Sequence, residues 1–230
     1  VALKSKYISE DDKRLIKSFI GIFSRRLTSS SVNAKGYNIL GYVNLGKKKQ
    51  VVELADDLVA RFDKLKEKSE GSWRWFDKEM TWANALAPYA LIRAYGKTRN
   101  KKYINVALDA LGFFEMNCSK DGVPCPVGQK GWFVKGKEKA QFDQQPIEAA
   151  DTVWLYNELY QLSKNEKYLQ KAREWMGWYY GNNIKSRMIF DKQTGGVRDG
   201  LAENSVNENQ GAESIVTYLI AHLSFLNKIS

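Results

Sequence analysis

The sequence predicts an all-α fold, a domain built from helical hairpins. Three observations support this: a recurring helix–turn–helix plan, apolar residues at helical spacing, and very few strand-like segments. At 230 residues, the chain is long enough for one sizeable core. We therefore expect a single domain over residues 1–230 with about four helical hairpins.

The helix–turn–helix plan is visible as an internal repeat with an offset of 65 residues. Segments 91–114 and 156–181 align, and an earlier segment, 39–62, follows the same plan. The turns "GKTRN" and "SKNE" contain the Gly, Ser and Asn that are typical of connections between helices. Matching positions are Tyr95 and Tyr160, Lys102 and Lys167, Tyr103 and Tyr168, and Ala107 and Ala172.

Eight helices follow from apolar periodicity, as in Val51, Leu54, Ala55, Leu58 and Phe62. We expect two short strands within long loops, at 131–136 and 187–191. The expected helices, in chain order, span residues 10–27, 33–45, 48–67, 79–97, 101–117, 144–163, 166–180 and 210–227.

The composition is that of an ordinary globular protein that is rich in aromatics, with 13% aromatic residues and seven Trp. No apolar run reaches the roughly 18 residues that span a bilayer, and residues 1–14 lack a signal-peptide core. We expect a soluble, cytoplasmic protein with no membrane partner. The net charge of +10 raises nucleic acid as a partner, but the lysines are spread over short clusters, several at helix ends. We therefore do not expect nucleic-acid binding.

Several kinds of chemistry are poorly supplied. Cys118 and Cys125 lie in one loop, where a local disulfide is possible but structural or free thiols are favoured. His222, the only histidine, falls on an apolar stripe and is interpreted as a hydrogen-bonded core residue. There is no phosphate loop, no dinucleotide-binding motif and no Cys–His or Ser–His pair at a recognisable spacing. We expect no metal and no cofactor.

Acids, amides and Trp residues gather in three long loops that each end at a helix start. If the repeat holds, these helix starts share one end of the domain. Capping could explain each acid singly, but it does not explain paired amides or loop tryptophans. Sugars need polar partners for hydroxyls and aromatic rings for C–H faces. The residues are Trp73, Trp75, Asp77, Asn84, Trp132, Asp143, Gln144, Gln145, Glu148, Asp199, Asn209, Gln210 and Glu213.

The strings "WRWFDKEMTWANALAPYAL", "FDQQPIEAADTV", "TGGVRDGL" and "VNENQGAESIVTYL" resemble the helical-toroid domains associated with family-4-type glycosyltransferases. Those domains are similar to six-hairpin glycosidases and sugar 2-epimerases, and the resemblance runs from about residue 30 to the C-terminus. It implies an oligosaccharide or glycoconjugate ligand and a glycosyltransferase partner. Two departures weaken a catalytic role at the first string: Asp77 replaces Glu, and Ala83 replaces an acid. The resemblance also implies an (α/α)-toroid-like fold. The chain is shorter than the family's domain, so it could be an incomplete barrel that upstream sequence or another subunit completes, or the short form could be the whole protein. An open arc would expose apolar helix faces, and we expect self-association if nothing lies upstream.

We therefore favour a carbohydrate-active domain, most simply a glycoside hydrolase that inverts by fold analogy. Asp143 and Glu213 form the leading acid/base pair, with Glu148 and Asp199 in reserve. Trp73, Trp75 and Trp132 would stack on sugar rings. Hydroxyls would be bound by the remaining polar residues, namely Asp77, Asn84, Gln144, Gln145, Asn209 and Gln210. The main alternative is a non-catalytic saccharide-binding or scaffold module that serves a glycosyltransferase. Epimerase chemistry and a protein-interaction solenoid are further alternatives.

Overall fold

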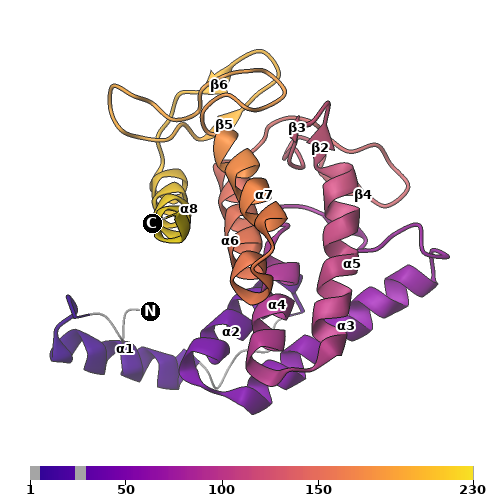
Figure 1. Ribbon diagram of the computed structural model, residues 1–230, viewed down its shortest axis with the longest axis vertical. Coiled ribbons are helices and arrows are strands. Elements are labelled where there is room, and N and C mark those ends of the chain that lie inside the picture. Colours follow the sequence, from indigo (N-terminus) through magenta and orange to yellow (C-terminus); the bar gives the residue numbers. More distant parts are fainter. Residues whose placement is uncertain (1–5, 24–29, 230) are drawn as a thin grey trace.

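The computed structural model confirms an all-α architecture of helical hairpins (Figure 1). It describes residues 6–23 and 30–229. The helices are α1 (Glu10–Phe23), α2 (Val32–Leu45), α3 (Lys48–Glu67), α4 (Leu86–Thr98), α5 (Lys101–Asn117), α6 (Pro146–Ser163), α7 (Glu166–Gly177) and α8 (Ala212–Ile229). The predicted end of the first helix, residue 27, lies outside the described residues.

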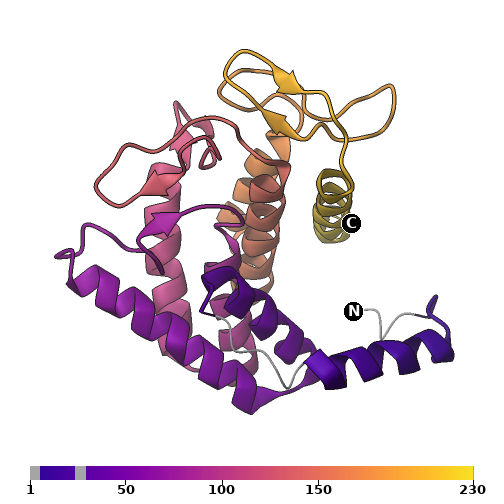
Figure 2. The same cartoon turned by 180° about the vertical axis from the view of Figure 1, so that it is seen from behind.

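The helices pack as inner and outer layers. Inner helices α2, α4, α6 and α8 contact one another in that order, and α3, α5 and α7 each pair with the inner helix before them. Within the described residues, three hairpins therefore form rather than the four expected, since α8 has no following partner and α1 lies apart (Figures 1 and 2). None of the described helices is both long and apolar enough to cross a membrane.

The repeat is visible in how the hairpins turn. Asn100 and Asn165 each cap the following helix by accepting a hydrogen bond at 3.1 Å from the backbone N–H two residues on. Arg99 and Lys164 adopt the left-handed conformation that ends the preceding helix. The alignment by 65 residues therefore reflects a shared local geometry.

Six two-residue strands occur in the long loops: β1 (Glu79–Met80), β2 (Ser119–Lys120), β3 (Val123–Pro124), β4 (Phe133–Val134), β5 (Gly200–Leu201) and β6 (Val206–Asn207). They pair antiparallel as β1 with β4, β2 with β3, and β5 with β6. The strand expected within 131–136 is present as β4, whereas 187–191 contributes only isolated bridges at Met188 and Phe190.

The predicted helix start at residue 79 is wrong, because 79–80 form β1 and α4 begins at Leu86. Pairing with β4, far along the chain, overrides the local helical pattern. Asp77 is consequently no helix cap, and among the described residues its carboxylate accepts a hydrogen bond only from the adjacent Lys78 N–H. Asp143 is not a cap either, since Gln145 holds the N-cap position of α6.

The expected exposure of the loop tryptophans is also wrong for Trp73 and Trp75, each only 4% exposed. Trp73 packs edge-on against Phe113 and Phe133, and its Nε1 donates to the Asp77 carbonyl at 2.6 Å. Trp132 is partly buried against the same core. The fold therefore uses the Trp73 indole as a core residue.

The two cysteines and the single histidine lie in or against the core. Cys118 and Cys125 are both buried and free, as favoured. His222 lies against the core with its ring 5.5 Å from that of Tyr218. However, its Nδ1 has no hydrogen-bond partner among the described residues, so the expected core hydrogen bond at this atom is not formed.

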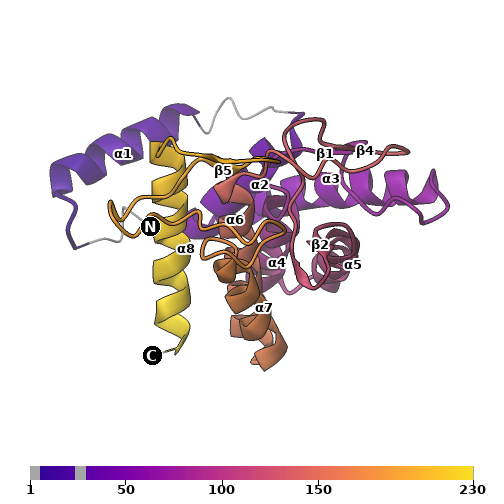
Figure 3. The same cartoon turned by 90° about the horizontal axis from the view of Figure 1, so that it is seen from above.

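The long loops join into one layer at one end of the helices, and the tight turns lie at the other (Figures 1 and 2). The β1–β4 pair links the α3–α4 loop to the α5–α6 loop. Gln144 and Leu201 exchange two backbone hydrogen bonds of 2.9 Å, which link the α5–α6 loop to the α7–α8 loop. Figure 3 looks onto this loop end.

The backbone at Gly128 approaches the backbone at Phe142 so closely that only glycine fits there. A Cβ there would lie 2.0 Å from the Phe142 carbonyl oxygen. Gly128→Ala should therefore lower the free energy of unfolding by about 1–3 kcal/mol. Gly112→Ala, in α5 with open space around it, should be neutral or stabilising. Chemical denaturation of both variants tests this, and equal stabilities would contradict the packing of these loops.

Candidate functional site

One pocket, of about 260 Å³, opens between the start of α2 and the α3–α4 loop. It brings together Trp75, Asp77 and Asn84, three of the residues predicted to bind substrate. Trp82, which is 41% exposed, and Glu79 also line it. We call it the α2 pocket. Its exposed indole is Trp82 rather than Trp73, which sequence reasoning had chosen.

Asn84 connects the α2 pocket to the buried carboxyl of Glu148. Its side-chain Nδ2 and its backbone N–H donate to Glu148 Oε2 at 3.0 and 3.3 Å. Glu148 is 1% exposed, and its Oε1 has no hydrogen-bond partner among the described residues. Burial raises the pKa of Glu148 to about 7, against the opposing effect of the Asn84 and Ala83 hydrogen bonds. Glu148 can therefore hold a proton near neutral pH.

Asp151 lies one turn further along α6 and is fully buried. Neither of its carboxyl oxygens has a partner in the described part of the chain. Burial raises the pKa of Asp151 well above its usual value, and the nearby charges of Glu148 and Glu213 raise it further. An unpaired buried carboxylate is costly, so the neutral form is favoured at this position.

Glu213 and Tyr37 interact electrostatically with these two acids. Glu213 is exposed in the first turn of α8. Burial raises the pKa of Tyr37, on α2, to about 12, and the charges of Asp151, Glu213 and Glu148 add to the rise. The three acids, Glu148, Asp151 and Glu213, form what we call the carboxyl cluster.

A second pocket, of about 360 Å³, lies between the α5–α6 and α7–α8 loops. Asp143, Gln145 and Asp199 line it, together with Gln144 and Asn207. Glu213 does not line this pocket; it belongs electrostatically with Glu148 and Asp151. Asp143 and Glu213, the leading pair predicted from sequence, therefore share neither described pocket. We call this second cavity the loop pocket.

Gln144 has a structural role that its sequence position did not reveal. It is fully buried, and its Oε1 accepts from Trp178 Nε1 at 2.9 Å. Its Nε2 donates to the Gln141 carbonyl, also at 2.9 Å. Both ends of this amide are thus used within the protein, which leaves little capacity for a sugar hydroxyl.

Asp199 anchors the start of α8. Its carboxylate accepts from Gly211 N at 2.8 Å, from Ser214 Oγ at 2.6 Å and from Asn209 Nδ2. Burial alone would raise the pKa of Asp199, but the hydrogen bonds from Ser214, Gly211 and Asn209 together lower it. Asp199 is thus ionised and engaged in hydrogen bonds at the start of α8.

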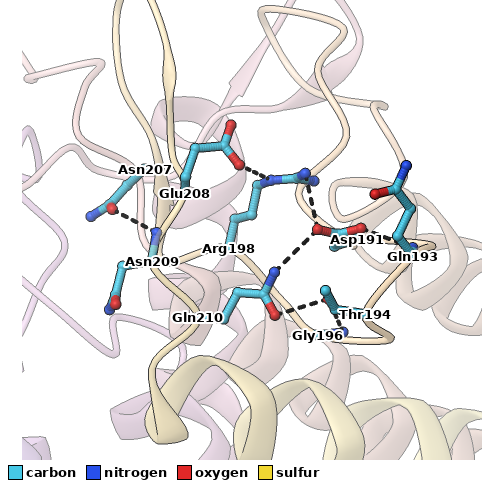
Figure 4. Close-up of polar contacts among 9 residues, drawn as sticks. All are labelled: Asp191, Gln193, Thr194, Gly196, Arg198, Asn207, Glu208, Asn209 and Gln210. Carbon is cyan, nitrogen blue, oxygen red and sulfur yellow. Dashed lines mark hydrogen bonds and ion pairs between the residues drawn. The ribbon is translucent and has the colours of Figure 1, made fainter.

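Gln210 is held in a network within the α7–α8 loop (Figure 4). Its Nε2 donates to Asp191 at 3.1 Å, and its Oε1 accepts from Thr194 at 2.9 Å. Arg198 bridges Asp191 and Glu208 in the same network. The amide of Gln210 therefore orders this loop.

Sequence reasoning missed Asp151, Tyr37 and Trp82. Asp151 carries a recognisable signal, since it follows Glu148 by three residues and interrupts an apolar helix. No comparable signal marks Tyr37, which reaches the cluster only through the packing of α2. Across the described residues, no three His, Cys, Asp or Glu side chains are grouped so as to hold a metal ion.

Comparison with known proteins bears on the fold of the chain. Residues 60–142 match the model of the D-glucuronyl C5-epimerase C-terminus, which is less than half of the chain. A search of the curated proteins finds no match. Solved structures do match, with sequence identities low enough that they bear on the fold alone.

One is the GH76A α-1,6-mannanase of Salegentibacter sp. HEL1_6, with a TM-score of 0.60 and 14% identity over 87% of this chain and 55% of that one. An inactive variant of it in complex with α-1,6-mannotriose has a TM-score of 0.53 and 16% identity, over 86% and 52% of the two chains. A D-mannose isomerase has a TM-score of 0.58 and 18% identity, over 86% and 54%. The chain thus has an (α/α)-toroid fold and spans a little over half the length of these structures.

The raised pKa of Glu148 predicts how stability depends on pH. In the unfolded chain Glu148 ionises near 4.5, and in the folded chain near 7. Its contribution to stability is complete below about pH 4.5 and is lost as the pH rises through 7. Glu148→Gln, which carries no proton equilibrium, should remove a fall on the order of 3 kcal/mol in the free energy of unfolding across this window.

Urea denaturation at several pH values measures this slope, with Glu203→Gln, at an exposed loop position, as the control. Asp151→Asn should reduce the slope in the same direction. An unchanged slope in Glu148→Gln would contradict the assignment.

Proposed function

We propose that the chain acts as a glycoside hydrolase and that the carboxyl cluster is its reactive centre. The saccharide would bind where the long loops meet the ends of the inner helices, a region that we call the mouth. The observation that carries the proposal is the buried Glu148, whose pKa of about 7 leaves it protonated near neutrality with Oε1 uncommitted. Glycosidic bond cleavage needs one carboxyl that can donate a proton and a second that is ionised. Glu148 supplies the first.

Glu213 is our candidate for the second carboxyl. It is exposed in the first turn of α8, where the positive end of the helix dipole favours a carboxylate. In this scheme Glu148 protonates the leaving oxygen, and Glu213 takes a proton from the attacking water. Asp151, buried one turn further along α6, stays neutral. Glu148 thus replaces Asp143 as the acid of the predicted pair.

The surrounding pockets suggest how a sugar would be held. In the α2 pocket, the exposed Trp82 indole offers a stacking surface for a sugar ring beside Asp77. In the loop pocket, the side chains of Asp143 and Gln145 have no hydrogen-bond partner among the described residues, so they are free to bind hydroxyls. The mannanase and mannose isomerase that share the fold make mannose-containing oligosaccharides the first ligands to test.

A binding module without turnover is the second candidate. Ala83 is buried where the resembling domains carry an acid, and Asp77 replaces their Glu, so this side of the mouth has less acid chemistry than theirs. Such a module would hold a glycan for a glycosyltransferase. A glycosyltransferase partner and a cytoplasmic location remain parts of our proposal and rest on the sequence alone.

The deciding experiment is a turnover and binding screen against mannose-, glucose- and galactose-containing oligosaccharides. Glu148→Gln should lower turnover by roughly 100-fold or more while binding survives, because the proton donor is lost. Turnover of the unaltered chain should fall as the pH rises above about 7, because Glu148 then ionises.

Glu213→Gln should give a similar loss, whereas Glu203→Gln, at an exposed loop position, should leave turnover unchanged. Saccharide binding with no turnover at any pH, in the unaltered chain, would support the binding module instead. Full turnover in Glu148→Gln would remove Glu148 from the mechanism.

A further inference from the structure

The tight turns of the three hairpins carry most of the net charge of the chain. Residues 46–49, 96–102 and 163–167 contain nine cations and one acid, Glu166, for a net charge of +8 against +10 for the whole chain. All nine cations are exposed. They are Lys47, Lys48, Lys49, Lys97, Arg99, Lys101, Lys102, Lys164 and Lys167, and we call this surface the basic end.

The three turns lie at the helix ends away from the long loops. In Figure 1 the α2–α3 and α4–α5 turns lie at the bottom of the molecule, and the α6–α7 turn ends higher up (Figures 1 and 2). Lys102 pairs with Asp63 at 3.5 Å, and the other eight cations have no ion-pair partner in the described part of the chain. The charge is therefore largely uncompensated.

Helix stability accounts for only three of these nine cations. Lys97 lies in the last turn of α4, and Arg99 and Lys164 are the C-caps of α4 and α6, where a cation is favourable. The other six lie at the amino ends of α3, α5 and α7, where the helix dipole opposes positive charge; α3 and α5 have no acid in the first turn. The sequence interpretation, in which several lysines lie at favourable helix ends, holds for Lys64 and Lys66 in the last turn of α3 but not for the lysines of residues 47–49.

Tyrosine rings accompany the cations. Arg99 lies 5.8 Å from the Tyr95 ring, Lys164 lies 5.6 Å from Tyr160, and Lys167 lies 4.8 Å from Tyr168. All three rings are partly buried. Amphipathic aromatic rings beside lysines are typical of surfaces that meet the headgroup region of a bilayer.

We propose that the basic end docks the domain on an anionic membrane surface. Eight of the nine cations are lysines, compact point charges suited to lipid phosphates, and they lie in three tight turns between helices. A nucleic-acid site would favour Arg and open aromatic platforms in a groove, which these partly covered rings do not offer. The expectation of no membrane partner rested on the absence of an apolar run long enough to span a bilayer, and peripheral binding to a membrane surface does not require such a run.

Docking at this end orients the carboxyl cluster. The 18 residues of α6 separate its two ends by about 27 Å. Glu148 lies in the first turn of α6, at the opposite end from Lys164. The saccharide-binding mouth would therefore face away from the bilayer, toward glycans carried well above the lipid surface. Membrane docking itself does not depend on the proposed function.

Cosedimentation with vesicles tests the proposal. The probes are phosphatidylcholine vesicles with or without about 30 mol% phosphatidylserine, at about 0.1 M salt. The tip variant combines Lys48→Glu, Lys101→Glu and Lys167→Glu. The control combines Lys78→Glu, Lys130→Glu and Lys192→Glu, three exposed positions in the long loops, so the change in net charge is the same.

The unaltered chain and the control should bind the anionic vesicles and ignore the neutral ones, and the tip variant should bind at least tenfold more weakly. Its thermal midpoint should be unchanged or higher, because acids suit first helical turns, which excludes unfolding as the cause. No binding by the unaltered chain, an equal loss in the control, or binding to duplex DNA or single-stranded RNA without binding to vesicles would each overturn the proposal.

Discussion

The arrangement of the long loops depends on the hydrogen bonds that Gln144 forms with Leu201 in the α7–α8 loop and with Trp178 after α7. Its backbone exchanges hydrogen bonds with Leu201, and its side chain joins Trp178 to the Gln141 carbonyl. Gly200 must lack a Cβ there, since the added atom would lie 2.7 Å from the Gln144 carbonyl oxygen. This pairing fixes the α5–α6 and α7–α8 loops over the same ends of the inner helices. Few loops of this length keep one conformation without such cross-links.

The fixed loops determine which polar groups are left for function. The side chains of Gln144, Asp199 and Gln210 form hydrogen bonds within the protein, so they are not available to bind a ligand. Glu148 and Asp151 lie on α6, shortly after Gln144 in the chain, and both are buried. Oε1 of Glu148 and both carboxyl oxygens of Asp151 have no hydrogen-bond partner among the described residues. A buried polar group that folding leaves unsatisfied lowers stability, and such groups cluster at functional sites. The carboxyl cluster is therefore a better candidate site than the loop acids.

The helices were predictable from sequence because their signals are local. The predicted bounds 48–67 and 101–117 match α3 and α5 to the residue. The start of α4 was not predictable, since β1 depends on pairing with β4 from a distant loop. Which amides serve the fold could not be read from spacing either, because the partners of Gln144 and Gln210 come from other segments. Asp151 could have been predicted as a site residue from the sequence, since its spacing from Glu148 puts both acids on one face of a helix.

The protonation state of Glu148 is the claim on which the proposed chemistry rests. It can be measured directly by NMR with ¹³C-labelled glutamate side-chain carboxyls, the Glu148 signal being identified by its loss in Glu148→Gln. We expect an apparent pKa near 7 for this signal. A signal that titrates near 4.5, the usual value for a glutamate, would mean that Glu148 is ionised at neutral pH and cannot serve as the proton donor.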